Sequence, residues 1–178
     1  MRRLLIASVL AATPFTAFAA GSETGTPPTP TETTETCADG LIFDLATQTC
    51  MTPDQSSNDD NAMMDAVREL SYAGRFADAR TVLDRLDAND TMVQTYYGFT
   101  ARKLGDDDSA LFHYQAALAI DPDNNLARSY MGQGMVDASD LFGAHAQLRE
   151  IRARDGRQTW PEVALRMAID SRGMGASY

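Results

Sequence analysis

A pattern of paired amphipathic segments that occurs three times constrains this sequence more than any other feature. The clearest copy is Thr91 to Pro122, in which two segments with apolar residues at spacings of three and four flank a break at Gly105. An alanine recurs in the second segment of each copy, at positions 79, 110 and 144, with steps of 31 and 34 residues. Such spacing predicts α-helices, and helix pairs recurring at this period predict an array whose neighbouring pairs share a core.

The small residues of the pattern have a packing role. Gly98 and Gly132 carry no side chain at points where we expect two helices to approach closely. Tyr114 supplies volume beside one of these points, and Pro122 ends the second helix of the central copy. Because no copy can bury its apolar face alone, about three copies are needed for a stable array, and this chain has three.

The central copy resembles the tetratricopeptide repeat. The residues that match the family pattern are Tyr97-Gly98, Ala101, Ala110, Tyr114 and Pro122, with Gln94 where the family prefers Trp. The flanking copies match more weakly, through Met63, Ala66-Val67, Leu70, Ala79 and Leu83 before it and through Arg128, Met131-Gly132, Met135, Ala144 and Leu148 after it. The resemblance covers residues 61–156. It implies an all-α fold of three tetratricopeptide helix-turn-helix repeats in a short right-handed solenoid.

Residues 157–178 are predicted to form a C-terminal capping helix and a tail. Thr159 and Glu162 have the spacing of a capping box, and Pro161 is acceptable in a first turn. One apolar face of this helix would cover the last repeat, as a terminal helix of an array requires. We interpret Trp160, the only Trp, as a packing anchor, with contact to a partner as the alternative.

The first twenty residues have the features of a signal peptide. Arg2 and Arg3 precede an apolar run, and Ala17-Phe18-Ala19 has the pattern of a cleavage site. We therefore expect an exported protein, periplasmic or secreted, without stable membrane insertion after cleavage. The alternative is an apolar N-terminal helix buried in the fold.

Residues 21–60 are predicted to be a flexible Thr/Pro-rich linker that carries a disulfide hairpin. Cys37 and Cys50 are the only cysteines and would pair in an oxidising compartment. Gly40 suits a turn before a short strand. The order of cysteines, Gly40, Phe43 and Asp44 also resembles part of the peritrophin-type chitin-binding modules. This resemblance leaves a glycan-associated or cell-wall-associated binding protein as an alternative to a structural hairpin.

Composition and motifs argue against several functions. The formal charge of −10 disfavours binding to phosphate backbones and anionic lipids, so we expect no nucleic-acid partner. His113 and His145 fall in different copies, and neither has a nearby Cys or Ser as a candidate nucleophile. We predict no enzyme activity, no metal and no cofactor. A hydrolase or transferase subunit that uses one of these histidines is the remaining alternative.

We predict a protein–protein interaction module, a periplasmic adaptor or envelope assembly factor. In stacked helix pairs the first helices line the concave side. The groove would bind a peptide or helix that carries an acidic or C-terminal carboxylate group. Its candidate residues are Met64, Arg68, Tyr72, Met92, Thr95, Tyr96, Phe99, Arg102, Lys103, Ser129, Gln133 and Val136. The alternative for Tyr96 and Phe99 is packing between repeats, because an error of one residue in helix phase exchanges the two roles.

Overall fold

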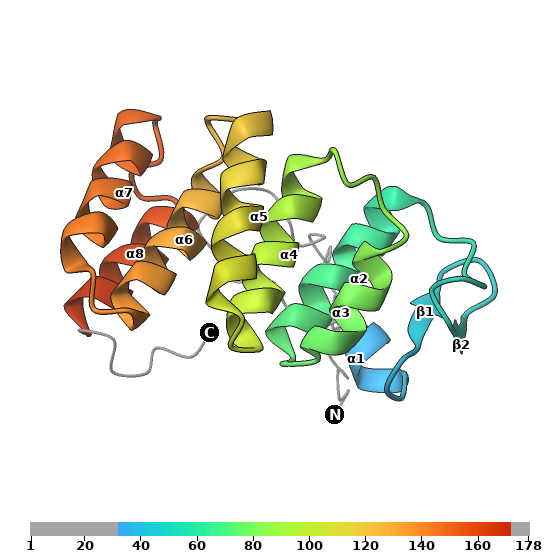
Figure 1. Ribbon diagram of the computed structural model, residues 1–178. Coiled ribbons are helices and arrows are strands. Elements are labelled where there is room, and N and C mark those ends of the chain that lie inside the picture. The colour runs from blue at the N-terminus through green and yellow to red at the C-terminus, as the bar shows by residue number, and fades with distance from the viewer. Residues whose placement is uncertain (1–31, 172–178) are drawn as a thin grey trace, which may run out of the picture.

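The computed structural model describes residues 32–171, which are mostly helical (Figure 1). The elements, in order, are α1 (Glu32–Thr36), β1 (Ile42–Asp44), β2 (Thr49–Met51), α2 (Asp60–Tyr72), α3 (Phe76–Leu83), α4 (Thr91–Lys103), α5 (Asp107–Ile120), α6 (Asn125–Asp137), α7 (Leu141–Ala153) and α8 (Trp160–Asp170). The predicted signal peptide and the end of the predicted tail lie outside the described residues. None of the helices within residues 32–171 combines the length and apolar character needed to cross a membrane.

The helices between residues 60 and 153 form three consecutive pairs, as predicted. The pairs α2/α3, α4/α5 and α6/α7 follow one another across the molecule, with α8 packed against α6 and α7 (Figure 1). The first helices of successive pairs contact one another, α2 with α4 and α4 with α6, and α8 continues this series. We call the surface shared by these first helices the inner face.

Short acidic and amide side chains fix where the repeat helices begin. Asp90, Asp106, Asn124 and Asp140 each accept a hydrogen bond from a backbone N–H in the first turn of α4, α5, α6 and α7. The prediction of a capping box at the start of α8 is wrong. The Thr159 hydroxyl donates instead to the Gly156 carbonyl oxygen, 2.6 Å away, and makes no cap hydrogen bond.

The glycines of the repeat pattern lie at close helix contacts, as predicted. A Cβ on Gly98 would be 2.6 Å from the ring of Tyr114, and one on Gly132 would be 2.8 Å from Leu165. Tyr114 and Leu165 are both buried. The pairs α4/α5 and α6/α8 can therefore approach this closely only because these two positions have no side chain.

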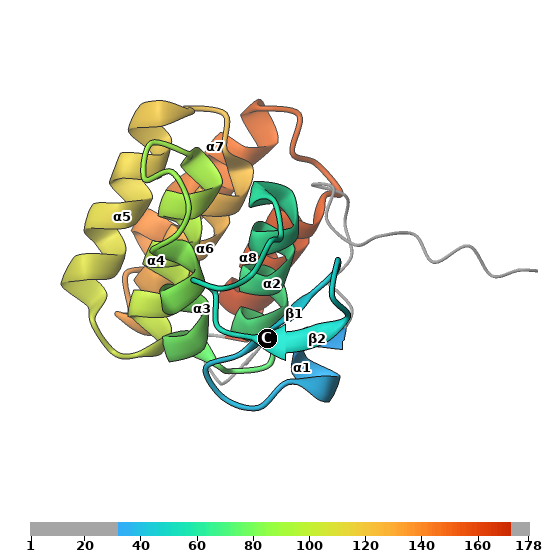
Figure 2. The same cartoon turned by 90° about the vertical axis from the view of Figure 1, so that its right-hand side faces the viewer.

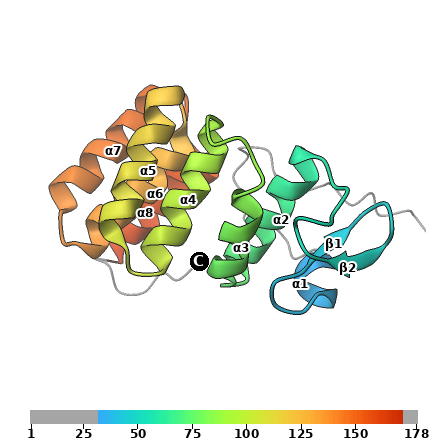
Figure 3. The same cartoon turned by 45° about the vertical axis from the view of Figure 1, so that its right-hand side comes forward.

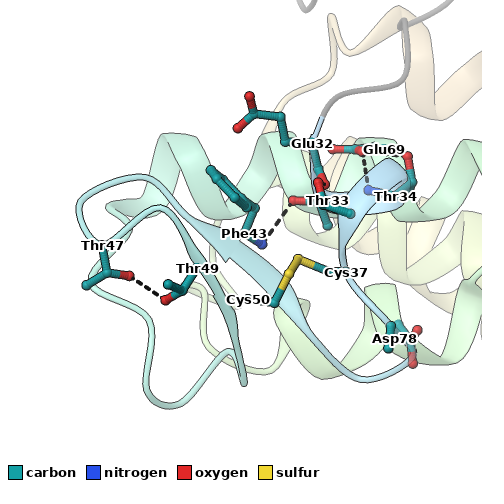
Figure 4. The surroundings of a disulfide bond; sticks show 12 residues. Glu32, Thr33, Thr34, Cys37, Phe43, Thr47, Thr49, Cys50, Glu69 and Asp78 are labelled. Atoms are coloured by element: carbon teal, nitrogen blue, oxygen red, sulfur yellow. Dashed lines mark hydrogen bonds between the residues drawn. A yellow bond between two sulfur atoms is a disulfide. The ribbon is translucent and has the colours of Figure 1, made fainter.

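The N-terminal part adds a small sheet to the predicted all-α fold. Strands β1 and β2 pair antiparallel, with Phe43 opposite Cys50, and Cys37 and Cys50 form the predicted disulfide (Figure 4). The hairpin and α1 lie beside the α2/α3 pair (Figure 3). The prediction of a hairpin closed by a disulfide is therefore confirmed, and its first strand begins two residues after Gly40.

The segment predicted as a flexible linker makes defined contacts from residue 32 onward. Backbone N–H and hydroxyl groups of Thr34 donate to the buried carboxylate of Glu69 on α2 (Figure 4). Ser57 donates to the buried carboxylate of Asp44, and Asn58 Nδ2 donates to the Phe43 carbonyl oxygen, 2.9 Å away. The polar residues that are typical of a solvated linker are here the donors that join the hairpin to the helices.

Candidate functional site

The predicted groove residues lie on the inner face, but they divide by burial. Thr95, Tyr96, Phe99, Ser129 and Val136 are buried. The partly exposed members are Met64, Arg68, Tyr72, Met92, Arg102, Lys103 and Gln133. Tyr96 and Phe99 pack between the repeats, which is the alternative that the sequence left open. Only the second group can contact a partner without rearrangement of the core.

Phe99 is the centre of an aromatic cluster under the inner face. Its ring centroid lies 4.7 Å from that of Tyr130 and 6.3 Å from that of Tyr72, against which it stacks. Tyr96 and Phe76 meet it edge-on, each at 6.1 Å. Burial raises the pKa of Tyr96 and of Tyr130, so both phenols stay protonated. The cluster joins α2, α3, α4 and α6 and forms a layer of packed aromatic rings beneath the inner face.

Tyr130 is a member of the cluster that was not predicted from the sequence. It lies 34 residues after Tyr96, which is the step between the last two repeats. The same repeat position therefore contributes a ring to the cluster from both α4 and α6, at a centroid distance of 6.3 Å. The period itself was the signal that could have identified this residue.

Three cationic side chains surround the aromatic cluster. Arg68 pairs with Asp65 at 3.4 Å, and Arg102 pairs with Asp137 at 2.7 Å. Lys103 Nζ lies 5.7 Å from the Phe99 ring centroid, and Arg102 Cζ lies 6.0 Å from the same centroid. Lys103 differs from both arginines because within residues 32–171 it makes no hydrogen bond or ion pair. Burial and the neighbouring charge of Arg102 lower the pKa of Lys103, while the charge of Asp137 acts in the opposite direction without forming an ion pair with it. We call this half-buried ammonium over the Phe99 ring the Lys103 site.

The two histidines do not form a catalytic arrangement with the neighbours that the structure gives them. His113 stacks on the Tyr97 ring at 5.1 Å, and its Nδ1 lies 2.7 Å from Gln94 Oε1. His145 is exposed on α7. Among the described residues, no three His, Cys, Asp or Glu side chains are grouped as a metal site would require.

Two cavities are lined by residues other than Lys103. One, of about 300 Å³, lies where the α4–α5 and α6–α7 turns meet, and its lining includes Arg102, Leu111 and Met135. The other, of about 480 Å³, lies between the hairpin, α1 and the start of α2. The sequence predicted neither, because both depend on how separate elements pack.

Comparison with known families agrees with the repeat pattern. Residues 93–124, which span most of α4 and α5, match the family model for the tetratricopeptide repeat. Searches of curated proteins and of solved structures gave no significant match. The family match and the arrangement of helix pairs support a tetratricopeptide repeat protein. Such repeats generally mediate protein–protein interaction and are generally non-catalytic.

Proposed function

We propose that this protein is an exported protein-binding module that receives a carboxylate of a partner peptide at the Lys103 site. The observation that carries the proposal is the ammonium of Lys103, which is half-buried over an aromatic ring without a carboxylate partner among the described residues. An adaptor or assembly role in the bacterial envelope would be built on this binding.

The electrostatics of the site favour a carboxylate. Partial burial makes the charged form of Lys103 less favourable, which is why its pKa is lowered. A carboxylate bound beside the ammonium would offset this cost, as ion pairs shielded from water do when their hydrogen bonds are satisfied. Arg68 and Arg102 already have carboxylate partners, so Lys103 is the cation of the inner face best placed to receive one.

The overall charge restricts the partner further. A chain with a net charge of −10 repels a strongly acidic peptide at long range. A single carboxylate on an otherwise neutral or apolar segment, such as a peptide C-terminus, avoids most of that repulsion. The partly exposed Tyr72 supplies apolar surface for the rest of the segment.

The proposed compartment has separate support. The Cys37–Cys50 disulfide is typical of proteins in oxidising compartments, and the first twenty residues have the composition of a signal peptide. Fractionation of cells that express the full chain, followed by N-terminal sequencing, tests export. Export predicts a mature N-terminus at Ala20 or Gly21 in the envelope or medium fraction, whereas an intact Met1 in the cytoplasmic fraction would contradict it.

Binding can be tested with a library of random octapeptides, prepared once with free C-terminal carboxylates and once as C-terminal amides. The purified chain should enrich free-acid peptides, and Lys103→Glu should weaken the selected peptides about tenfold. Arg149→Glu on the exposed face of α7 makes the same change in net charge and is the matched control. Equal enrichment of acids and amides, or equal loss in both variants, would reject the Lys103 site.

A further inference from the structure

The cavity beside the disulfide hairpin has apolar and acidic walls. Phe43 and Leu45 of the hairpin line it on one side, and Ala66 of α2 lies on the other. Leu45 is 64% exposed and lines this cavity of about 480 Å³, so its side chain is accessible to a ligand there. In Figure 4 the Phe43 ring and the Glu32 side chain project on the same side of the hairpin. We call this cavity the hairpin pocket.

The walls of the hairpin pocket are held by contacts between segments. The carboxylate of Asp44 accepts a hydrogen bond from Ser57 N at 2.6 Å, which joins β1 to the chain entering α2, and one from Thr47 N at 2.8 Å within the hairpin. Arg75 donates to the carbonyl oxygens of Cys37 and Ala38, at 2.9 and 2.8 Å. The pocket is therefore formed before any ligand arrives, which reduces the entropy lost on binding.

The charges of the pocket select its ligand. Glu32, Asp59 and Asp65 line it, and there is no Lys or Arg among its described lining residues. Burial, and to a smaller extent the charge of Asp59, raises the pKa of Asp65, although Arg68 opposes that shift. Asp65 already pairs with Arg68 at 3.4 Å, and Asp59 accepts a hydrogen bond from Ala62 N at 2.9 Å. A bound cation would pair with Glu32 and add a favourable interaction with the other two carboxylates. The exposed Leu45 offers apolar surface beside these carboxylates, which a ligand with both a charged and an apolar part can use.

We propose that the hairpin pocket binds a basic side chain, Lys or Arg, from a segment of a partner protein whose neighbouring apolar residue packs on Leu45 and Phe43. A basic side chain combines an apolar stem with a charged end, and this matches the apolar wall and acidic rim. The inference is independent of the Lys103 site, which has the opposite charge and lies on the inner face.

A fluorescein-labelled octapeptide of alternating Leu and Arg tests this proposal. Its N-terminus carries the label and its C-terminus is amidated, so it offers no terminal carboxylate to Lys103. The octapeptide in which Gln replaces Arg is the peptide control. We expect the Arg peptide to bind the full chain at least about tenfold more tightly than the Gln peptide. Its affinity should fall as NaCl is raised.

Matched variants locate the binding. Glu32→Gln with Asp65→Asn should raise the dissociation constant of the Arg peptide about tenfold. Leu45→Ser should weaken binding without unfolding the chain, because Leu45 is largely exposed. The control pair, Asp108→Asn with Asp170→Asn, makes the same charge change at exposed positions on α5 and α8.

Two results would overturn the proposal. Equal losses in the pocket variants and the control pair would show that the acidic surface as a whole attracts the peptide. Binding of chitotetraose that is lost on Leu45→Ser, with no difference between the Arg and Gln peptides, would instead assign the pocket to a glycan. Neither result would affect the Lys103 site, which is tested with free-acid peptides.

Discussion

The indole Nε1 of Trp160 donates a hydrogen bond to the hydroxyl of Tyr72, 3.3 Å away and 88 residues earlier in the chain. The same hydroxyl lies 3.1 Å from that of Tyr130. Helix α8 therefore contacts the first repeat through this hydrogen bond, in addition to α6 and α7. Figure 2 views the molecule from the side of α2, and α8 lies behind α2 in this view. Trp160 thus joins the two ends of the inner face, which supports its interpretation as a packing anchor.

Tyr72→Phe tests this connection. The change removes the hydroxyl that accepts from Trp160 and should lower the free energy of unfolding by about 1 kcal/mol. Because Trp160 is the only Trp, its fluorescence emission should also shift. Tyr97→Phe is the control, since the Tyr97 hydroxyl donates to Asp84 away from Trp160. An emission spectrum that is the same in Tyr72→Phe and in the wild type would contradict the connection.

Gly98→Ala should destabilise the central repeat. The added Cβ would lie 2.6 Å from the Tyr114 ring and 3.1 Å from the Ala110 carbonyl oxygen. Moving a buried ring and a helix backbone should cost about 2 kcal/mol, measured by urea denaturation. Gly134→Ala is the comparison, because the nearest atom there is Cδ of the Arg102 side chain at 3.1 Å. If both variants lose the same stability, the close approach of α4 and α5 is not the reason for glycine at position 98.

Protonation of Asp44 at low pH should weaken the hydrogen bonds that hold the hairpin. Backbone N–H donors from Thr47 and Ser57 lower the pKa of this carboxyl well below its usual value. Because the pKa of Asp44 is lower in the folded chain than in the unfolded chain, the ionised carboxylate stabilises the fold at pH values above the unfolded pKa, which is near 4. This stabilisation is lost as the pH falls below that value toward the pKa of the folded state. The amide NMR signals of Thr47 and Ser57 should therefore stay constant from about pH 7 to 4 and move below that range.

Asp44→Asn should reproduce the acid effect at neutral pH, since it removes the charge. Faster amide exchange at Thr47 and Ser57 would report the change. Asp54→Asn, at a carboxyl that is 81% exposed and paired with Arg85, is the matched control. Unchanged exchange in Asp44→Asn would show that the carboxylate does not hold the hairpin.

His113 should titrate below the ordinary histidine pKa. Burial, and secondly the charge of Arg80, lower its pKa, while Asp106 acts in the opposite direction. A lowered histidine pKa means that stability is lost as the pH falls below about 6.5, because the unfolded chain then binds the proton more readily. NMR titration should show a higher pKa in Arg80→Met than in the wild type, with Arg149→Met as the control. An identical titration in Arg80→Met would remove Arg80 as a cause.

The sequence predicted the helix pairs because local features determine them. Gly98, Ala110 and Tyr114 are spaced by the geometry of two packed helices, so their order alone indicates the repeat. The burial of Tyr96 and Phe99 was not predictable with the same certainty. Helix α4 is packed against α2, α5 and α6, so it carries apolar residues on several sides and its pattern does not identify one buried face.

Long-range contacts account for the ordered part of the predicted linker and for the hairpin pocket. The bonds from Thr34 to Glu69 and from Ser57 to Asp44 join residues 35 and 13 positions apart. Composition indicates only that such residues are polar, and it cannot indicate which buried carboxylate they reach. The hairpin pocket depends on these contacts, so the sequence could not predict it.

The state of Lys103 gives the most direct test of the proposed function. Lys103 is the only lysine in the chain, so protein labelled with ¹³C-lysine gives one ε-methylene signal. We expect a free-acid peptide selected from the library to raise the lowered pKa of Lys103 and shift this signal, because a bound carboxylate favours the ammonium form. The corresponding amide should do neither. A free-acid peptide that binds and leaves the Lys103 signal and its titration unchanged would contradict the account.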